Sequence, residues 1–533
     1  MVDAKALWID PVVIPDDDYA DLPALIRRHA DAFPEKPALR VGEVRQNWAR
    51  LAAAMDATAQ ALRNLGIGPG DVVAILGEPS AGYLHAFLGT LAAGGAAAPL
   101  PVSASDTALA TMLADSGAKV LAASSGLAAR GAALVAAARP AAVVQVGLDG
   151  AAGPDGASLP GMAETAAAGD LPAIAPEALF NIIYSSGTTG TPKGIVHDHL
   201  FRNRQLRRMR EFGLDESRTT LVSTAMYSNT TLVAALAALG NGGTLVMMPK
   251  FTPAGFLDLV ADARPTHTTL VPVQIQRILA DPAFGGADLS SLISTVVTSS
   301  RSPVQMKREM MARWPGRLYE MYGMTEGGLT SSLDLRSNPE KIGSVGMPAK
   351  AADIRIIGPD DTEVPAGETG EVVGRSPIMM RGYHRQPELT ARSLVRLENG
   401  STYLRTGDLG HFDPDGFLHL SGRTKDVIIS GGYNIYASDL EEVLLTDPAV
   451  LHASVIGVPS PDWGETPVGY VVLRAGAETG AEAVRSRAND QLGKVQRLSE
   501  VRIVKALPLN GLGKVIKADL RRLWQDQSAT VSA

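Results

Sequence analysis

The chain has 533 residues, 45% of them hydrophobic, which is too long for a single hydrophobic core and predicts several domains. Its 49 basic and 56 acidic residues give a net charge of −7 without a basic block, which argues against nucleic acid or an anionic membrane surface as a partner. The absence of cysteine excludes disulfides, thiolate metal sites and a cysteine nucleophile.

The first part of the chain alternates between predicted helices and short apolar strands. Helical periodicity over 48–62 and apolar runs at 72–76 and 120–123 indicate an α/β unit with a parallel sheet. The Ala- and Gly-rich segment 122–168 is expected to form a helix and loops at a periphery. A second α/β unit should follow, and its strands are predicted at 220–224, 244–248, 268–271 and 294–298.

The later part of the chain has a different pattern of predicted elements. Short alternating strands with Gly and Pro turns over 346–420 predict a small β-barrel or meander. An α+β unit with a helix at 438–445 and a strand at 468–473 is expected after it. The fold class is therefore α/β, with a large N-terminal domain (1–424) of two α/β subdomains plus the barrel, and an α+β C-terminal domain (425–533).

Residues 184–194 form a glycine-rich loop between two apolar runs. Gly187, Gly190 and Gly194 let backbone N–H groups approach phosphate oxygens, and Lys193 adds positive charge. A Walker A loop is excluded, because the lysine is followed by glycine rather than by Ser or Thr and a helix. A flexible linker is the alternative, but it would need neither flanking strands nor a lysine. The loop therefore predicts a polyphosphate site.

Further clusters carry candidate chemistry, each with an ordinary structural alternative. Glu326 follows Thr325 at a strand end, where it is suited to hold Mg²⁺ beside a phosphate, although alone it would more often be a plain loop carboxylate. Asp408 lies in a Gly turn and is suited to accept both hydroxyls of a ribose, or equally to cap its own turn. Segment 420–435 is either a hinge with a backbone edge open to a ligand or a plain hairpin. Lys514 lies on a Gly-rich loop, where a solvated turn lysine is the commoner case.

The order and the intervals of these clusters are the most specific feature of the sequence. Together with segments 65–71 and 115–119, they resemble the core motifs of the adenylate-forming enzymes: acyl- and aryl-CoA synthetases, adenylation domains of nonribosomal peptide synthetases, and beetle luciferases. The resemblance covers nearly the whole chain. It implies a first half-reaction that joins a carboxylate to the α-phosphate of ATP with release of pyrophosphate, and a second that passes the acyl group to a thiol.

This resemblance implies roles toward ATP, Mg²⁺ and CoA for individual residues. Tyr322 would stack on adenine, Thr325 would contact the α-phosphate, and Glu326 would hold Mg²⁺. Lys514 would bridge the carboxylate and the α-phosphate in the transition state. The remaining residues expected to bind nucleotide or CoA are Ser185, Ser186, Gly187, Thr188, Thr189, Gly190 and Lys193 for the β- and γ-phosphates, Asp408 and Arg423 for the ribose, and Gly431 and Gly432 for CoA.

Lys425 matches the position about which the C-terminal domain of this family rotates. The rotation withdraws the lysine loop and brings forward the face that carries segment 430–432, whose backbone lines the pantetheine tunnel in the family. The resemblance therefore implies a mobile C-terminal domain, so that one site serves two reactions.

Departures from the family pattern bear on the acid substrate. Arg301 stands in a loop where the family has small residues against the adenine, so it must point away, contact the nucleotide or reshape the acyl pocket. No carboxylate follows the strand at 221–225, where amino-acid-activating members carry an acidic residue, and this argues against an α-amino acid. The residues expected to line the acyl pocket are Tyr227, Ser228, Asn229, Ser299, Ser300, Arg301 and Gly327.

The sequence therefore predicts an AMP-forming carboxylate:CoA ligase for an apolar acid, whether aryl, alicyclic or fatty. The alternatives are an acyl-AMP ligase that loads a carrier protein and a nucleotide-binding regulatory protein without turnover. The presence of both Lys514 and Glu326 argues against the regulatory protein. We expect a soluble, cytoplasmic protein with neither a signal peptide nor a membrane span, as a monomer or a homodimer.

Overall fold

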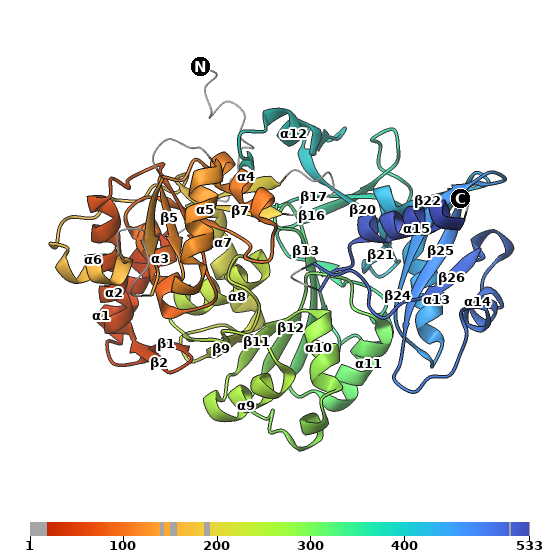
Figure 1. Ribbon diagram of the computed structural model, residues 1–533, viewed down its shortest axis with the longest axis horizontal. Coiled ribbons are helices and arrows are strands. Elements are labelled where there is room, and N and C mark those ends of the chain that lie inside the picture. Colours follow the sequence, from red (N-terminus) through yellow and green to blue (C-terminus); the bar gives the residue numbers. More distant parts are fainter. Residues whose placement is uncertain (1–18, 139–142, 150–156, 186–191, 511–512, 532–533) are drawn as a thin grey trace. The chain divides into compact units, whose positions relative to one another are not determined.

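The computed structural model describes residues 19–138, 143–149, 157–185, 192–510 and 513–531 (Figure 1). The chain divides into two compact units. Unit 1 comprises Met1–Pro339, Ala349–Asp353 and Arg375–Leu394, and unit 2 comprises Glu340–Pro348, Ile354–Gly374 and Val395–Ala533. The domain boundary expected at 424/425 falls inside unit 2 and stays a prediction. Among the described residues, no helix has both the length and the apolar character needed to cross a membrane.

One sheet of unit 1 contains the strands predicted for the second α/β unit. Its strands are β1 (Pro37–Val41), β2 (Val44–Asn47), β9 (Thr219–Val222), β10 (Thr244–Met247), β11 (His267–Leu270), β12 (Ser294–Val297), β13 (Arg317–Gly323) and β14 (Thr330–Asp334). They run in the order β14-β13-β12-β11-β9-β10-β1-β2. Pairing is parallel from β13 to β1, whereas β14 and β2 pair antiparallel with their neighbours. The predicted strands are confirmed with slightly shifted ends.

The other sheet of unit 1 carries the glycine-rich loop. Its strands are β3 (Val72–Leu76), β4 (Ala96–Pro99), β5 (Val120–Ala123), β6 (Val144–Gly147), β7 (Leu179–Ser185), β8 (Lys193–Asp198) and β18 (Gly382–Tyr383), in the order β18-β8-β7-β4-β3-β5-β6. The predicted strands at 72–76 and 120–123 are confirmed and pair in parallel. The prediction of only a helix and loops over 122–168 is wrong, because β6 pairs with β5. Tertiary pairing outweighs the weak local pattern there.

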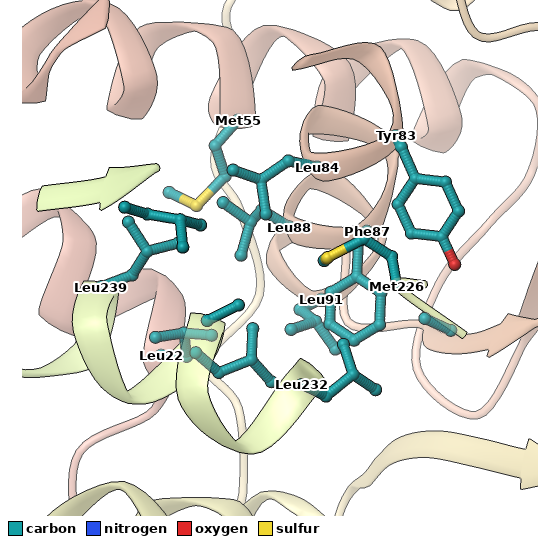
Figure 2. Close-up of a cluster of buried hydrophobic side chains, with 14 of the residues drawn as sticks. Leu22, Met55, Tyr83, Leu84, Phe87, Leu88, Leu91, Met226, Leu232 and Leu239 are labelled. Atoms are coloured by element: carbon teal, nitrogen blue, oxygen red, sulfur yellow. The ribbon is translucent and has the colours of Figure 1, made fainter. Parts of the chain in front are cut away.

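Helices pack against both sheets, and several of them share one apolar core. They are α1 (Leu22–Ala32), α2 (Trp48–Asn64), α3 (Ala81–Ala92), α4 (Asp106–Ser116), α5 (Ala128–Ala138), α6 (Leu159–Thr165), α7 (His199–Arg208), α8 (Asn229–Gly240), α9 (Pro253–Ala263), α10 (Pro272–Leu279), α11 (Val304–Arg313) and α12 (Pro387–Arg392). Figure 2 shows Leu22, Met55, Leu88 and Leu239, from α1, α2, α3 and α8, in one cluster. Burying each such side chain contributes about 1.5–3 kcal/mol. The core therefore fixes α8, whose first turn carries predicted pocket residues.

Unit 2 contains two smaller sheets. The first comprises β16 (Asp353–Ile357), β17 (Gly370–Arg375), β19 (Leu394–Arg396), β20 (Thr402–Phe412) and β21 (Leu418–Arg423). The second comprises β22 (Val427–Ser430), β23 (Tyr433–Tyr436), β24 (Val450–Ser460), β25 (Gly464–Leu473) and β26 (Glu500–Ile503). Unit 2 also contains β15 (Met347–Pro348) and the helices α13 (Ala437–Thr446), α14 (Ala481–Asn489) and α15 (Lys517–Val531). The predicted β-rich section and the α+β section after it are both confirmed.

Candidate active site

The glycine-rich loop connects the antiparallel strands β7 and β8. Their register pairs Ser185 with Lys193 and Tyr184 with Gly194. A Cβ on Gly194 would lie 2.9 Å from a methyl carbon of Ile182, so a larger residue would need the strand to shift. The flanking strands expected for this loop are therefore present. The phosphate ligands predicted within the loop, Ser186, Gly187, Thr188, Thr189 and Gly190, lie outside the described residues.

Tyr383, which the sequence analysis missed, contacts two predicted site residues. The Lys193 ammonium lies 5.8 Å from the centroid of the Tyr383 ring. Its hydroxyl donates to Oε1 of Glu326 at 2.9 Å. Burial, and then the Glu326 carboxylate, raise the pKa of Tyr383, so the hydroxyl stays protonated and remains a donor. One side chain thus links the lysine that ends the phosphate loop to the carboxylate predicted to hold Mg²⁺.

The turn 324–328 between β13 and β14 carries the predicted catalytic residues of unit 1. The Met380 N–H donates to the carbonyl oxygen of Glu326 at 2.8 Å. Gly327 has a φ of +74°, and a Cβ there would lie 2.2 Å from the carbonyl oxygen of Ile378. Both observations require this turn to lie close against the segment 375–394. Gly327 therefore has a packing reason to be glycine, and its role in the acyl pocket stays a prediction.

The loop after β12, predicted to face the adenine, is anchored by a buried carboxylate. Glu320 forms an ion pair with Lys307 and accepts from the N–H of Ser302 at 3.1 Å. Ser299 has a φ of +83°, an uncommon conformation for a residue other than glycine. Arg301, between Ser299 and Ser302 in the chain, is exposed. Its contact with a nucleotide stays a prediction, as does the stacking role of Tyr322, which lies half-buried on β13.

Residues expected to line the acyl pocket open helix α8. Ser228 is its N-cap, and the Ser228 Oγ accepts from the N–H of Thr230 at 3.2 Å. The hydroxyl of Tyr227 lies 3.2 Å from Oγ of Ser103. Within the described part of the chain, the buried Oδ1 of Asn229 has no hydrogen-bond partner. Such an acceptor costs about 1–3 kcal/mol, so a donor from a ligand or water would relieve that cost.

The two residues predicted to bind ribose form an ion pair in unit 2. Asp408 on β20 faces Arg423 on β21, and Oδ1 lies 2.8 Å from Nε. The arginine side chain is 39% exposed and the aspartate 14%. The local sequence pattern predicts both residues but not their pairing, which depends on the antiparallel register. The pair is available to a ligand mainly from the arginine side.

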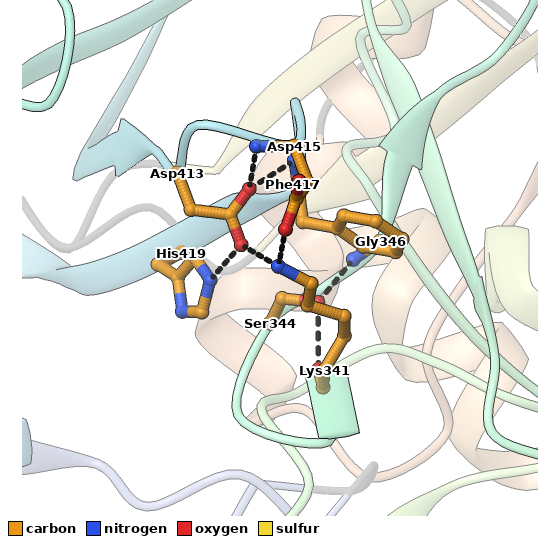
Figure 3. Close-up of polar contacts among 7 residues, drawn as sticks. All are labelled: Lys341, Ser344, Gly346, Asp413, Asp415, Phe417 and His419. Carbon is orange, nitrogen blue, oxygen red and sulfur yellow. Dashed lines mark hydrogen bonds and ion pairs between the residues drawn. The ribbon is translucent and has the colours of Figure 1, made fainter. Parts of the chain in front are cut away.

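The turn that joins β20 to β21 is held by a charged cluster around Asp413 (Figure 3). Its carboxylate accepts from Nζ of Lys341 at 2.8 Å, from Nε2 of His419 at 3.2 Å and from the N–H groups of Asp415 and Phe417 at 3.0 and 2.9 Å. Although burial raises the pKa of Asp413, the hydrogen bonds from Lys341 and Phe417 hold it well below its usual range. This cluster fixes the hairpin that carries the ion pair described above.

Lys514 lies shortly before α15 and is hydrogen-bonded to Asn510. Its N–H donates to Oδ1 of Asn510, and the Asn510 N–H donates to the carbonyl of Lys514, both at 2.9 Å. Desolvation by the surrounding protein, and then the positive charge of Arg423, lower the pKa of Lys514 to about 8, while Asp408 opposes them. Unit 2 thus brings the predicted catalytic lysine into electrostatic range of the predicted ribose pair.

A short 3-10 turn, Thr424–Asp426, links β21 to β22. Desolvation lowers the pKa of Lys425 within it. Its neighbour Asp426 forms an ion pair with Arg521 of α15 at 3.0 Å. The residue predicted to be the pivot therefore lies in the connection between the two sheets of unit 2. Its role in rotation stays a prediction.

The glycine pair predicted to line the CoA path forms the turn between β22 and β23. Gly431 and Gly432 have φ values of +57° and +83°, which favour glycine at both positions. A Cβ on Gly431 would lie 2.8 Å from the ring of Trp463. The turn needs glycine for its own geometry, so the contact with CoA stays a prediction.

Comparison with known proteins identifies relatives along nearly the whole chain. The family model for AMP-binding enzymes matches residues 26–384, and the model for the AMP-binding enzyme C-terminal domain matches 439–514. The chain is 34% identical over 502 residues to a feruloyl-CoA synthase from Amycolatopsis sp., covering 93% of this chain and 97% of the relative. It is 33% identical over 512 residues to a sulfoacetate–CoA ligase from Cupriavidus necator, with 94% and 97% covered. The solved structure of the amide bond synthetase McbA from Marinactinospora thermotolerans matches with a TM-score of 0.85 at 29% identity, covering 94% of this chain and 99% of McbA.

The Asp413 cluster predicts a pH-dependent contribution to stability. Asp413→Asn removes the ion pair with Lys341 and should lower the midpoint of thermal unfolding at pH 7 by roughly 2–8 °C. Because the pKa of Asp413 is lower in the folded state than in the unfolded chain, this stabilisation is present at neutral pH and is lost as the pH falls below about 4. The matched control is Asp415→Asn, which also removes an ion pair with Lys341, but one whose carboxylate is 67% exposed, so the variant should change the midpoint little. Equal midpoints for wild type and Asp413→Asn at pH 7 would contradict the assignment.

Proposed function

The chain belongs to the AMP-binding enzymes, the adenylate-forming family, and on that premise we propose that it activates an apolar carboxylic acid with ATP and transfers the acyl group to CoA. The observation that carries the proposal is the set of contacts around Tyr383, which joins Lys193 to Glu326 beside the glycine-rich loop. This set supplies a cation for phosphates and a carboxylate for a metal ion. The names of the curated relatives support CoA as the thiol acceptor.

In the proposed first half-reaction, a carboxylate oxygen attacks the α-phosphorus of ATP, and the bond to the leaving pyrophosphate breaks. Negative charge builds on the oxygens around phosphorus, where an ammonium and a hydroxyl stabilise the transition state. Lys514 supplies the ammonium and Thr325 the hydroxyl. In the second half-reaction, the thiol sulfur attacks the acyl carbon, a thioester forms and AMP leaves.

Glu326 fits the role of a Mg²⁺ ligand. Mg²⁺ is bound in such sites by one or two carboxylates together with substrate phosphates, so a preformed cage of protein ligands is not needed. When bound, the ion would neutralise charge on the phosphates. Tyr383 orients the Glu326 carboxylate for that contact.

The preference for an apolar acid rests on the residues proposed for the acyl pocket. Tyr227, Ser228 and Asn229 at the start of α8 carry no charge, and Arg301 is exposed. A charged tail on the acid would therefore find a counter-ion only at Arg301 among the proposed lining residues. A carrier protein in place of CoA is the alternative acceptor, and it leaves the adenylation step unchanged.

Lys514→Ala tests the adenylation step. The variant should lower carboxylate-dependent exchange of labelled pyrophosphate into ATP by about 100- to 1,000-fold, because it removes a charge that stabilises the transition state. Binding of ATP should change little. Lys505→Ala, at an exposed lysine outside the proposed site, is the control and should keep full exchange. Wild-type exchange in Lys514→Ala would contradict the proposal.

The role of Lys514 also predicts a pH dependence. In the wild type, kcat/KM should fall as the pH rises through about 8, because the cationic form of Lys514 is the active one.

Lys425→Pro tests the pivot. Proline restricts φ at that position, so the variant should retain pyrophosphate exchange while losing thioester formation from a pre-formed acyl-adenylate. The two half-reactions are to be measured separately on the same preparation. If both fall to the same extent, Lys425 is not the pivot.

A further inference from the structure

A buried histidine in unit 1 reaches the backbone of the predicted catalytic turn. His197 lies on β8, four residues after Lys193 in the chain, and is fully buried. Its Nε2 lies 2.8 Å from the carbonyl oxygen of Thr325. Because a carbonyl oxygen can only accept a hydrogen bond, Nε2 must carry the proton and donate it.

The other ring nitrogen of His197 faces donors only. Its Nδ1 lies 3.1 Å from Nδ2 of Asn181 and 2.9 Å from Nη2 of Arg202. A guanidinium has no acceptor, so Nδ1 must be unprotonated and accept. Both sides of the ring therefore require the same neutral tautomer. Burial, and then the charge of Arg202, lower the pKa of His197 and favour that neutral form.

Arg202 is held in one orientation by its neighbours. It is 1% exposed, and its Nε and Nη2 donate to Oδ1 of Asn181 at 3.0 and 2.8 Å. Its Nη1 donates to Oε1 of Gln205 at 2.6 Å. Within the part of the chain that the structure describes, these hydrogen-bond partners are all neutral. Burying a guanidinium among neutral acceptors costs several kcal/mol, so stability alone does not account for the network.

Stacking fixes the plane of the imidazole. The ring of Phe201 lies parallel to that of His197, with centroids 4.0 Å apart and planes 8° apart. The guanidinium carbon of Arg202 lies 5.4 Å from the centroid of the same phenylalanine. The direction of the Nε2–H bond is therefore set by hydrogen bonds at one edge of the ring and by stacking on its face.

We propose that His197 is a positioning residue for adenylation, and that it acts by holding the carbonyl of Thr325. The Thr325 carbonyl is fixed by His197, and the next carbonyl, of Glu326, is fixed by the N–H of Met380. With both carbonyls fixed, the two side chains between β13 and β14 keep the directions needed for the α-phosphate and Mg²⁺. The inference rests on the proposed function of Thr325 and Glu326.

Two polar substitutions of similar size separate positioning from packing. His197→Gln extends an amide N–H toward the former Nε2 position and can still meet the Thr325 carbonyl, whereas the shorter side chain of His197→Asn cannot. His197→Asn should lower kcat for pyrophosphate exchange by about 10- to 100-fold with little change in KM for the acid, and His197→Gln should restore most of this loss. Thioester formation from a pre-formed acyl-adenylate should be affected much less than exchange in both variants.

The two variants are compared at matched folded fractions, checked by thermal unfolding, and with the affinity for Mg²⁺-ATP measured by calorimetry. Equal exchange in His197→Gln and His197→Asn, after correction for folded protein, would overturn the inference while leaving the proposed function intact. If no acid of the panel supports pyrophosphate exchange by the wild type, the proposed function fails. The calorimetry then decides: weaker Mg²⁺-ATP binding in His197→Asn than in His197→Gln supports positioning of the turn, and equal binding refutes it.

Discussion

The hydrogen bond from Tyr383 to Glu326 is the interaction on which the proposed site in unit 1 depends. A polyphosphate site must keep positive charge and a metal-binding carboxylate close to each other and in fixed directions. Tyr383 contacts both, with Lys193 over its ring and Glu326 at its hydroxyl. The strand pair β8–β18 holds this tyrosine beside the phosphate loop, so sheet register sets the spacing of the charges.

Unit 2 also keeps charged side chains in fixed positions, but it does so with a β-hairpin. Its hairpin β20–β21 carries Asp408 and Arg423 face to face, and the cluster around Asp413 fixes the turn of that hairpin. Lys514 lies within electrostatic range of the ion pair: desolvation and then Arg423 lower its pKa to about 8, while Asp408 opposes them. A lysine with this pKa is cationic at neutral pH, as the proposed role in the transition state requires.

The sequence alone predicts the elements and most candidate residues, because both depend on local patterns. Apolar runs identify β3 and β5, and the glycine-rich loop is identified by its own composition between β7 and β8. Prediction from the sequence fails where contacts join segments that are distant in the chain. Tyr383 and His197 are separated from the turn 324–328 by more than fifty residues, and nothing near either of them in sequence indicates the contact. Strand β6 was missed because its local pattern is weak, and it forms because it pairs with β5.

The central claim is tested most directly by identifying the products that the wild-type protein forms from ATP, Mg²⁺ and CoA with each acid of an aryl, alicyclic and fatty panel. Mass spectrometry and nucleotide chromatography would follow the acyl and adenine groups together. We expect AMP, pyrophosphate and an acyl-CoA in equal amounts for at least one apolar acid. Formation of ADP and phosphate, or of AMP without an acyl-CoA for every acid in the panel, would contradict it.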